Sequence, residues 1–208
     1  MLIPSASNRL RHPRPPTRPL KFPVKLGLDL ICSSILLFTL GACSANERLK
    51  PPPVVAQVNL SRYLGQWYEI SRLPFHWQKG CVATTATYTM REDGRLRVLN
   101  RCLDGGLEGP QRSAEGVAWV VDSTTNARLK VQFFWPFRGD YWVLALDADY
   151  AWALVGTPDY EYLWLLSRTP SLPEDLVKQI LTRAQSLGYP VERMERTLQR
   201  ADNSPSSG

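Results

Sequence analysis

The sequence has few of the residues on which metal-ion and nucleophilic chemistry most often depend. Its 208 residues include only 2 histidines and 4 cysteines. It contains neither Gly-x-Ser-x-Gly nor His-Glu-x-x-His, and it has no glycine-rich phosphate loop and no zinc-ligand spacing. We therefore expect no catalytic residues of these classes, no metal ion and no other cofactor.

The sequence also lacks an excess of charge of one sign once its first residues are set aside. The whole chain has 25 Lys and Arg against 19 Asp and Glu, a net charge of +6. Six basic residues and one acidic residue lie in residues 1–42, which leaves 19 basic and 18 acidic residues in the remainder. A nearly neutral body offers no electrostatic surface for a phosphate backbone, so we expect no nucleic-acid partner.

No apolar stretch near the start of the chain is long enough to span a membrane. Residues 26–40 are apolar except for Asp29, and these 15 residues fall short of the roughly 20 that a spanning helix needs. Their length fits the apolar core of a secretory signal. Leu40-Gly41-Ala42-Cys43 follows and resembles the lipobox of bacterial lipoproteins, whose cysteine accepts the lipid. An ordinary signal peptide with a chance cysteine is the alternative.

The lipobox predicts how the first part of the chain is divided. Residues 1–42 are expected to form a signal peptide, and Cys43 is the expected lipidation site. Within the signal peptide, residues 1–23 are expected to lie upstream of the true translation start. Ser44, in place of an aspartate, indicates a lipid anchor in the outer membrane with the body facing the periplasm. Residues 43–57 contain three consecutive prolines and are expected to form a stiff spacer.

Two cysteines remain after the leader and the lipid site are assigned. Cys32 lies in the apolar signal, whereas Cys81 and Cys102 lie in the body of an exported chain, where disulfides persist. The rival interpretation is a catalytic thiol. Its histidine partner would have to be His76, the only histidine after the leader. We expect a disulfide.

The body of the chain shows short β-branched and aromatic segments separated by turn residues. Eight such segments at regular spacing favour a sandwich or a closed barrel, and no βαβ alternation is present. The predicted strands are residues 66–73, 82–90, 95–103, 112–121, 128–135, 140–147, 151–156 and 162–168.

One helix is expected after the strands. Ser171 and Glu174 have the spacing of a capping box, and Gly188 fits the position that ends a helix. Apolar residues recur between them at helical spacing, so this face should pack on the outer wall of a barrel. Residues 199–208 are small and polar, and we expect a disordered tail.

Three motifs in order resemble those of the lipocalins, and of bacterial outer-membrane lipocalins in particular. Residues 59–70 (NLSRYLGQWYEI) contain the Gly-x-Trp of the opening motif. Asp149-Tyr150 stands at the second motif, and residues 166–170 (LSRTP) carry the arginine of the third. The resemblance implies an all-β, eight-stranded up-and-down antiparallel barrel over residues 58–198, with one C-terminal helix. Five residues are then expected to close the barrel floor: Gly65, Trp67, Asp149, Tyr150 and Arg168.

The resemblance also implies a ligand, a fatty acid or a lysophospholipid bound in the barrel for storage or transport. It points to Tyr141 and Trp164 as lumen-facing. Alternation along the first strand places Glu69 with Trp67, and Arg72 on the opposite face. Alternation along the last strand places Tyr162 with Trp164. The candidate ligand contacts are Glu69, Tyr141, Tyr162 and Trp164.

The loops at the opposite end from the floor carry many aromatic residues. Such residues suit a lid over an apolar ligand or a surface that touches lipid headgroups, although they could simply pack on one another. They are Phe75, Trp77, Trp135, Phe137 and Tyr160.

Two other functions compete with lipid binding. A structural or interaction lipoprotein would have a barrel filled by its own side chains. An enzyme on this fold would need a free lumenal thiol or a carboxylate pair, such as Glu69 with Asp140 or Asp147, and we do not expect one. The chain is expected to be a monomer, or a homodimer.

Overall fold

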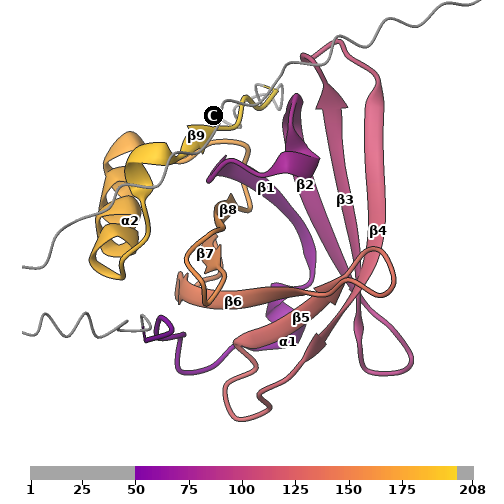
Figure 1. The fold of residues 1–208 in the computed structure, drawn as a ribbon, viewed down its shortest axis with the longest axis vertical. Helices are drawn as coiled ribbons and strands as arrows, with labels where there is room; N and C mark the ends of the chain where they lie inside the picture. The colour runs from indigo at the N-terminus through magenta and orange to yellow at the C-terminus, as the bar shows by residue number, and fades with distance from the viewer. Residues whose placement is uncertain (1–49, 201–208) are drawn as a thin grey trace, which may run out of the picture. The chain divides into compact units, whose positions relative to one another are not determined.

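The computed structural model describes residues 50–200, and these form an antiparallel β-barrel with a helix beside it (Figure 1). Each barrel strand pairs with the next along the chain. The strands are β1 (Gly65–Arg72), β2 (Cys81–Met90), β3 (Leu96–Asp104), β4 (Gln111–Val120), β5 (Arg128–Gln132), β6 (Gly139–Leu146), β7 (Trp152–Gly156) and β8 (Leu163–Ser167).

The sheet closes on itself through its first strand. β1 pairs with β8 on one side and, over Gly65–Tyr68, with β2 on the other. The predicted eight-stranded up-and-down barrel is thus confirmed, with strand bounds close to the expected ones. The largest difference is β5, which ends at Gln132 rather than at residue 135. A ninth short strand, β9 (Glu195–Arg196), was not expected. It pairs with the C-terminal end of β1, at Ser71 and Arg72.

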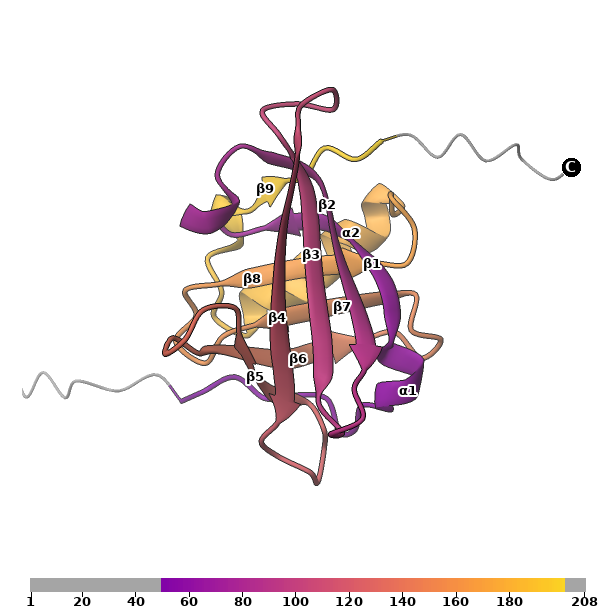
Figure 2. The same cartoon turned by 90° about the vertical axis from the view of Figure 1, so that its right-hand side faces the viewer.

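The strands cross the barrel in two directions. In Figure 2, β2, β3 and β4 run in front of β6, β7 and β8 and nearly at right angles to them. Alternate side chains of each strand point into the space between these layers. One cluster of buried residues lies between these layers; among its members are Trp67, Val98, Leu129 and Val143.

The predicted helix is α2 (Glu174–Ser186), and it ends as expected. Gly188 has a φ of +102°, a left-handed conformation that glycine adopts readily at a helix end. The predicted capping box is wrong, because the residue before the helix is Pro173 and no side chain caps it. The Ser171 carbonyl instead accepts a hydrogen bond from the Thr169 hydroxyl at 2.7 Å.

The apolar face of α2 packs on the outside of the barrel, as predicted (Figure 1). Ile180 and Ala184 are buried there against outward-facing residues of β6, β7 and β8 such as Leu144, Leu154 and Leu165. The Glu174 carboxylate also pairs with Arg196 of β9 at 2.5 Å. Among the described helices, none is long and apolar enough to cross a membrane.

The chain before β1 lies along the barrel. Pro52 is buried, the Val55 amide donates to the Val143 carbonyl at 3.0 Å, and the Val58 amide donates to the Thr125 carbonyl at 2.7 Å. The spacer was expected to reach residue 57, whereas residues 52–58 are held on the body by these hydrogen bonds and by the buried side chains of Pro52 and Val58. A short helix, α1 (Leu60–Tyr63), then leads into β1.

The chain after α2 returns to the barrel. It passes through the short helix η2 (Val191–Arg193) and β9 and continues to residue 200. We call residues 195–200 the C-terminal strap. The Thr197 amide donates to the Ile70 carbonyl of β1 at 3.0 Å, and the Ala83 amide of β2 donates to the Leu198 carbonyl at 2.6 Å. The strap therefore joins β1 to β2 where these strands no longer pair with each other.

Several sequence expectations concern parts of the chain outside the described residues. They are the signal peptide, its start, the lipidation site Cys43 and the tail from residue 201. The tail was expected to begin at residue 199. In the structure, however, the side-chain amide of Gln199 donates to the backbone carbonyls of Glu69 at 2.7 Å and of Thr84 at 3.0 Å.

Candidate ligand-binding cavity

A tryptophan and an arginine close one end of the barrel. Trp67 is fully buried, and the Arg168 guanidinium lies 3.8 Å from the centre of its ring. Arg168 donates to the backbone carbonyls of Gln66 and Arg62, each at 2.8 Å. These contacts fasten the end of β8 to α1 and to the start of β1. The cation–π contact contributes about 0.5–2 kcal/mol.

Gly65 gives this stacked pair its room. Its φ is +91°, and a Cβ there would lie 3.4 Å from the Arg168 guanidinium. A side chain at position 65 would therefore be strained by its backbone and would crowd the arginine.

The turn between β6 and β7 completes the floor. Tyr150 is nearly buried, its hydroxyl accepts from the Asn59 amide at 2.8 Å, and Arg62 lies 4.3 Å from the centre of its ring. Asp149 is exposed and lies 3.9 Å from Arg62. The five predicted floor residues thus gather at one end of the barrel, where Trp67 and Tyr150 are buried and Asp149 is exposed.

Three tyrosine hydroxyls meet just above the floor. The Tyr141 hydroxyl lies 2.8 Å from that of Tyr63 and 2.9 Å from that of Tyr88. Burial raises the pKa of Tyr88 to about 12 and raises the pKa values of Tyr63 and Tyr141 well above their ordinary range. The trio is therefore neutral, and it forms a small polar surface at the closed end.

A cavity of about 620 Å³ extends from this trio toward the other end of the barrel. Such a volume lies within the range of roughly 300–1,000 Å³ that is typical of small-molecule sites. Most of its wall is apolar, including Leu96, Val98, Leu129, Val131, Phe133 and Leu166.

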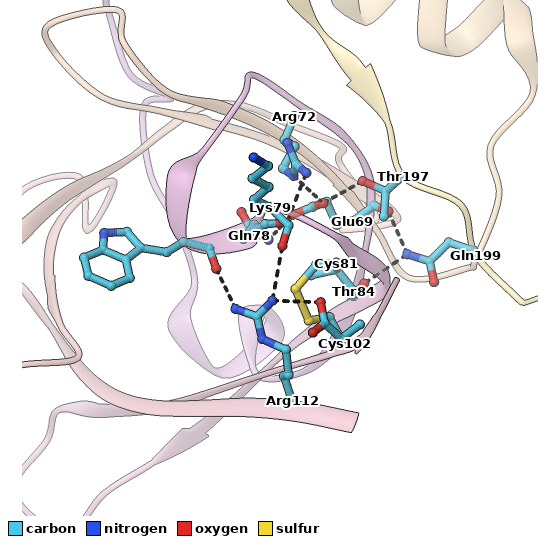
Figure 3. Close-up of a disulfide and its surroundings, with 12 residues drawn as sticks. Glu69, Arg72, Gln78, Lys79, Cys81, Thr84, Cys102, Arg112, Thr197 and Gln199 are labelled. Atoms are coloured by element: carbon cyan, nitrogen blue, oxygen red, sulfur yellow. Dashed lines mark hydrogen bonds and ion pairs between the residues drawn. A yellow bond between two sulfur atoms is a disulfide. The ribbon is translucent and has the colours of Figure 1, made fainter. Parts of the chain in front are cut away.

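A second polar cluster lies around Glu69, near the open end of the cavity. Gln78, from the short helix η1 (His76–Gln78), donates to the Glu69 carboxylate at 2.7 Å and accepts from the Trp164 indole at 3.1 Å. The Thr197 hydroxyl donates to Glu69 at 2.6 Å, and Arg72 lies 3.3 Å from it (Figure 3). Gln78 thereby connects the loop between β1 and β2 to two strands of the wall.

Burial dominates the electrostatics of this cluster. Glu69 is only 3% exposed, and the loss of hydration raises the pKa of its carboxyl. The hydrogen bonds from Thr197 and Gln78, and the charge of Arg72, act in the opposite direction but do not overcome burial. Arg72 also pairs with Glu195 of β9 at 2.6 Å.

A disulfide and an arginine hold the loop between β1 and β2 from below (Figure 3). Cys81 and Cys102 are bonded, with Cα atoms 5.4 Å apart, and join β2 to β3. Arg112 of β4 donates to the carbonyls of Trp77 and Lys79 and to Asp104. The disulfide agrees with the sequence prediction. It also leaves neither cysteine as a free thiol.

No group of histidine, cysteine, aspartate or glutamate side chains within residues 50–200 has the arrangement of a metal site. The barrel thus contains a cavity with a mostly apolar wall. It is closed at one end and has polar groups at both ends.

Comparison with known proteins identifies this architecture. The family model described as "Lipocalin-like domain" matches residues 58–199. The chain belongs to the lipocalin family. Lipocalins are binding proteins for small hydrophobic ligands rather than enzymes, so membership in the family confirms the expectation that the chain is not an enzyme.

Relatives of this lipocalin include bacterial and plant proteins. The outer membrane lipoprotein Blc of Escherichia coli K12 is 39% identical over 166 residues, which is 80% of this chain and 93% of Blc. The temperature-induced lipocalin-1 of Arabidopsis thaliana is 41% identical over 167 residues, 76% of this chain and 88% of that protein. The bacterial relatives are outer membrane lipoproteins, which confirms the outer-membrane location expected for this lipocalin.

Solved structures agree on the fold. Insecticyanin from the tobacco hornworm Manduca sexta superposes with a TM-score of 0.58 at 20% identity, over 74% of this chain and 85% of that chain. Lobster apocrustacyanin A1 gives a TM-score of 0.56 at 13% identity, over 76% of this chain and 94% of that chain. At these identities the likeness concerns the barrel alone.

The four candidate ligand contacts of this lipocalin all line one cavity. They are Glu69, Tyr141, Tyr162 and Trp164. The expected opposite placement of Arg72 is wrong, because a register shift between Glu69 and Ser71 interrupts the alternation of β1. This shift brings Arg72 beside Glu69.

Sequence reasoning missed several lining residues. Tyr88 could have been found, because it has the inward parity of its strand. Tyr63 lies on α1, which is too short to be recognised, and Gln78 lies in a loop whose path no periodicity predicts.

The five loop aromatics divide into two groups. Phe75 and Tyr160 pack on neighbouring rings, Phe75 on Tyr162 in the cavity wall and Tyr160 on Tyr189 in the cluster with α2, each at 5.0 Å between ring centres. Trp77, Trp135 and Phe137 are 67%, 85% and 77% exposed.

Proposed function

We propose that this lipocalin binds one fatty acid or lysophospholipid molecule in its barrel and stores or carries it at the outer membrane. The observation that supports this most is the cavity of about 620 Å³, whose wall is mostly apolar and which is closed at one end by Trp67 and Arg168. An acyl chain inserted there gains about 0.8 kcal/mol for each methylene group removed from water.

The same cavity argues against a barrel that is filled by its own side chains. Large residues such as Trp67, Tyr63 and Tyr88 fill the lower part only, and the wall above them leaves a continuous apolar space. The polar cluster at Glu69, Gln78 and Arg72 would then lie beside the headgroup of a bound amphiphile.

The membrane anchor belongs to the same proposal. Cys43, in the lipobox-like sequence Leu40-Gly41-Ala42-Cys43, would carry the lipid and fix the barrel to the outer membrane. Metabolic labelling with a radioactive fatty acid tests this directly. The wild-type chain should be labelled and fractionate with the outer membrane, whereas Cys43→Ala should be unlabelled and soluble. Equal labelling of both would contradict the assignment of the anchor.

Lipid binding is tested by titration. The purified protein is titrated with lysophosphatidylcholine and, separately, with a fatty acid of equal chain length, while tryptophan fluorescence is recorded. We expect saturable binding of one molecule per chain, weakened in Trp164→Ala because that indole lines the cavity and bonds to Gln78. Trp152→Phe serves as the matched control, since Trp152 packs in the cluster between the wall and α2. A protein that binds neither amphiphile would refute the proposal.

A further inference from the structure

The open end of the barrel exposes an unusual concentration of large apolar side chains. Trp77, Phe134, Trp135 and Phe137 are between 63% and 85% exposed. They come from two loops, residues 74–80 and 133–139, and the rings of Trp77 and Phe134 lie 6.2 Å apart between centres, so the two loops meet. Exposed aromatic patches of this kind mark surfaces that bind another protein or a membrane.

The charges on the same loops have one sign. Lys79 and Arg138 are exposed, and neither loop contains an aspartate or a glutamate. Asp140, at the end of the second loop, is neutralised by Lys130 at 2.7 Å. Aromatic side chains interleaved with basic ones match the interface of a phospholipid membrane, where rings lie among headgroups and cations pair with phosphates.

The path of the N-terminal segment shows which end of the barrel can face a membrane. At the start of the described chain, the Lys50 carbonyl accepts a hydrogen bond from Tyr160 at 2.5 Å. Tyr160 lies in the turn between β7 and β8, which is at the open end. Figure 2 shows the described chain beginning on the same side as the loop between β5 and β6, with α1 on the opposite side.

A short tether joins the proposed anchor to this end. Six residues, 44–49, separate Cys43 from Lys50. Seven Cα-to-Cα steps span at most about 25 Å. The tether starts beside Tyr160 at the open end, so Cys43 stays within about 25 Å of that end. An anchor at this distance would keep the open end within reach of the bilayer.

We propose that the open end of the barrel docks on the phospholipid membrane that holds its anchor, through Trp77, Phe134, Trp135 and Phe137, with Lys79 and Arg138 on the headgroup phosphates. The cavity would then open directly onto the source of its ligand. This inference rests on the anchor at Cys43 proposed above, and it is independent of which amphiphile the cavity binds.

A single introduced thiol tests the docking. Cys81 and Cys102 are bonded to each other and Cys43 would be lipidated, so a new cysteine is the one free thiol of the mature protein. Phe137→Cys, labelled with a polarity-sensitive dye, is reconstituted as the full mature lipoprotein into phosphatidylcholine vesicles, with or without phosphatidylglycerol. We expect a blue shift of the dye emission on reconstitution, larger with phosphatidylglycerol.

The matched control places the dye at the other end of the barrel. Asp149 has a 97% exposed side chain in the floor turn, so Asp149→Cys should show emission unchanged from water. Equal emission from the two positions would overturn the docking, as would a protein that fails to float with the vesicles. Titration of the same preparations with lysophosphatidylcholine reports on the cavity separately, so failure of docking and failure of ligand binding are distinguished.

Discussion

At the scale of single residues, the buried carboxyl of Glu69 links stability to pH. Because burial raises the pKa of this carboxyl above its ordinary value of 4.5, the folded protein holds the proton more tightly than the unfolded chain does. The contribution of Glu69 to stability is therefore complete below pH 4.5 and is lost as the pH rises through the folded-state pKa. Glu69→Gln should remove this loss, because the amide cannot ionise.

Denaturation in urea, repeated across the pH range, measures the effect. The free energy of unfolding of the wild type, relative to Glu69→Gln, should fall as the pH rises above about 4.5. Glu115 is the control, since Arg97 lowers the pKa of this exposed carboxyl and its contribution is lost as the pH falls. If the wild type and Glu69→Gln gave parallel curves, Glu69 would not be the group that titrates.

The tyrosine trio depends most on its central member. Tyr141→Phe removes the hydroxyl that bonds to both Tyr63 and Tyr88, and it leaves two buried hydroxyls without a partner. We expect a loss of about 1–3 kcal/mol in the free energy of unfolding. Tyr88→Phe should cost less, because the bond between Tyr63 and Tyr141 persists. Urea titration compares the two, and equal losses would mean that the hydroxyls do not act as a chain.

At the scale of elements, the C-terminal strap replaces a missing stretch of β-ladder. The Thr197 backbone amide donates to β1, and the Leu198 carbonyl accepts from β2. The side-chain amide of Gln199 donates to both strands. A chain ending at Met194 should therefore lose about 2–4 kcal/mol of stability. A chain ending at Arg200 is the control and should match the wild type.

The same truncation should affect a bound ligand. Without the strap, the wall between β1 and β2 is joined by direct pairing only over Gly65–Tyr68. We expect a fluorescent fatty acid to dissociate faster from the chain ending at Met194 than from the chain ending at Arg200. Identical dissociation rates at a temperature where both chains are folded would show that the strap does not help to close the wall of the cavity.

The elements that could be predicted are those with a clear periodicity or a β-branched and aromatic run between turn residues. Alternation in residues 82–90 and the apolar, aromatic run of residues 140–147 predicted barrel strands, and the helical spacing of Leu176, Ile180 and Ala184 predicted α2. The strap has no such signal: Gln199 was assigned to the tail, and Thr197 and Gln199 acquire partners only because β1 and β2 separate. Arg72 was misplaced for a related reason, because the register shift after Glu69 depends on pairing with β8.

At the scale of the whole molecule, ligand and fold stabilise each other. A ligand that binds only the folded barrel raises the free energy of unfolding by about 2.7 kcal/mol when its free concentration is 100 times its dissociation constant. Thermal unfolding with and without lysophosphatidylcholine should show this as a rise in Tm. The rise is expected whichever way the amphiphile lies in the cavity, because it depends only on binding to the folded state.

Filling the cavity separates this effect from ordinary stability. Ala118 is 3% exposed and lines the cavity, so Ala118→Phe should occupy space needed by an acyl chain. We expect the variant alone to unfold near the wild-type temperature, since apolar volume is added to an open space rather than to a packed core. Its Tm should then barely respond to lysophosphatidylcholine. Ala184→Phe, in the packed cluster beneath α2, is the contrasting variant, because overpacking there should lower the Tm while the response to ligand is retained. A full ligand response in Ala118→Phe would mean that the amphiphile binds elsewhere on the protein.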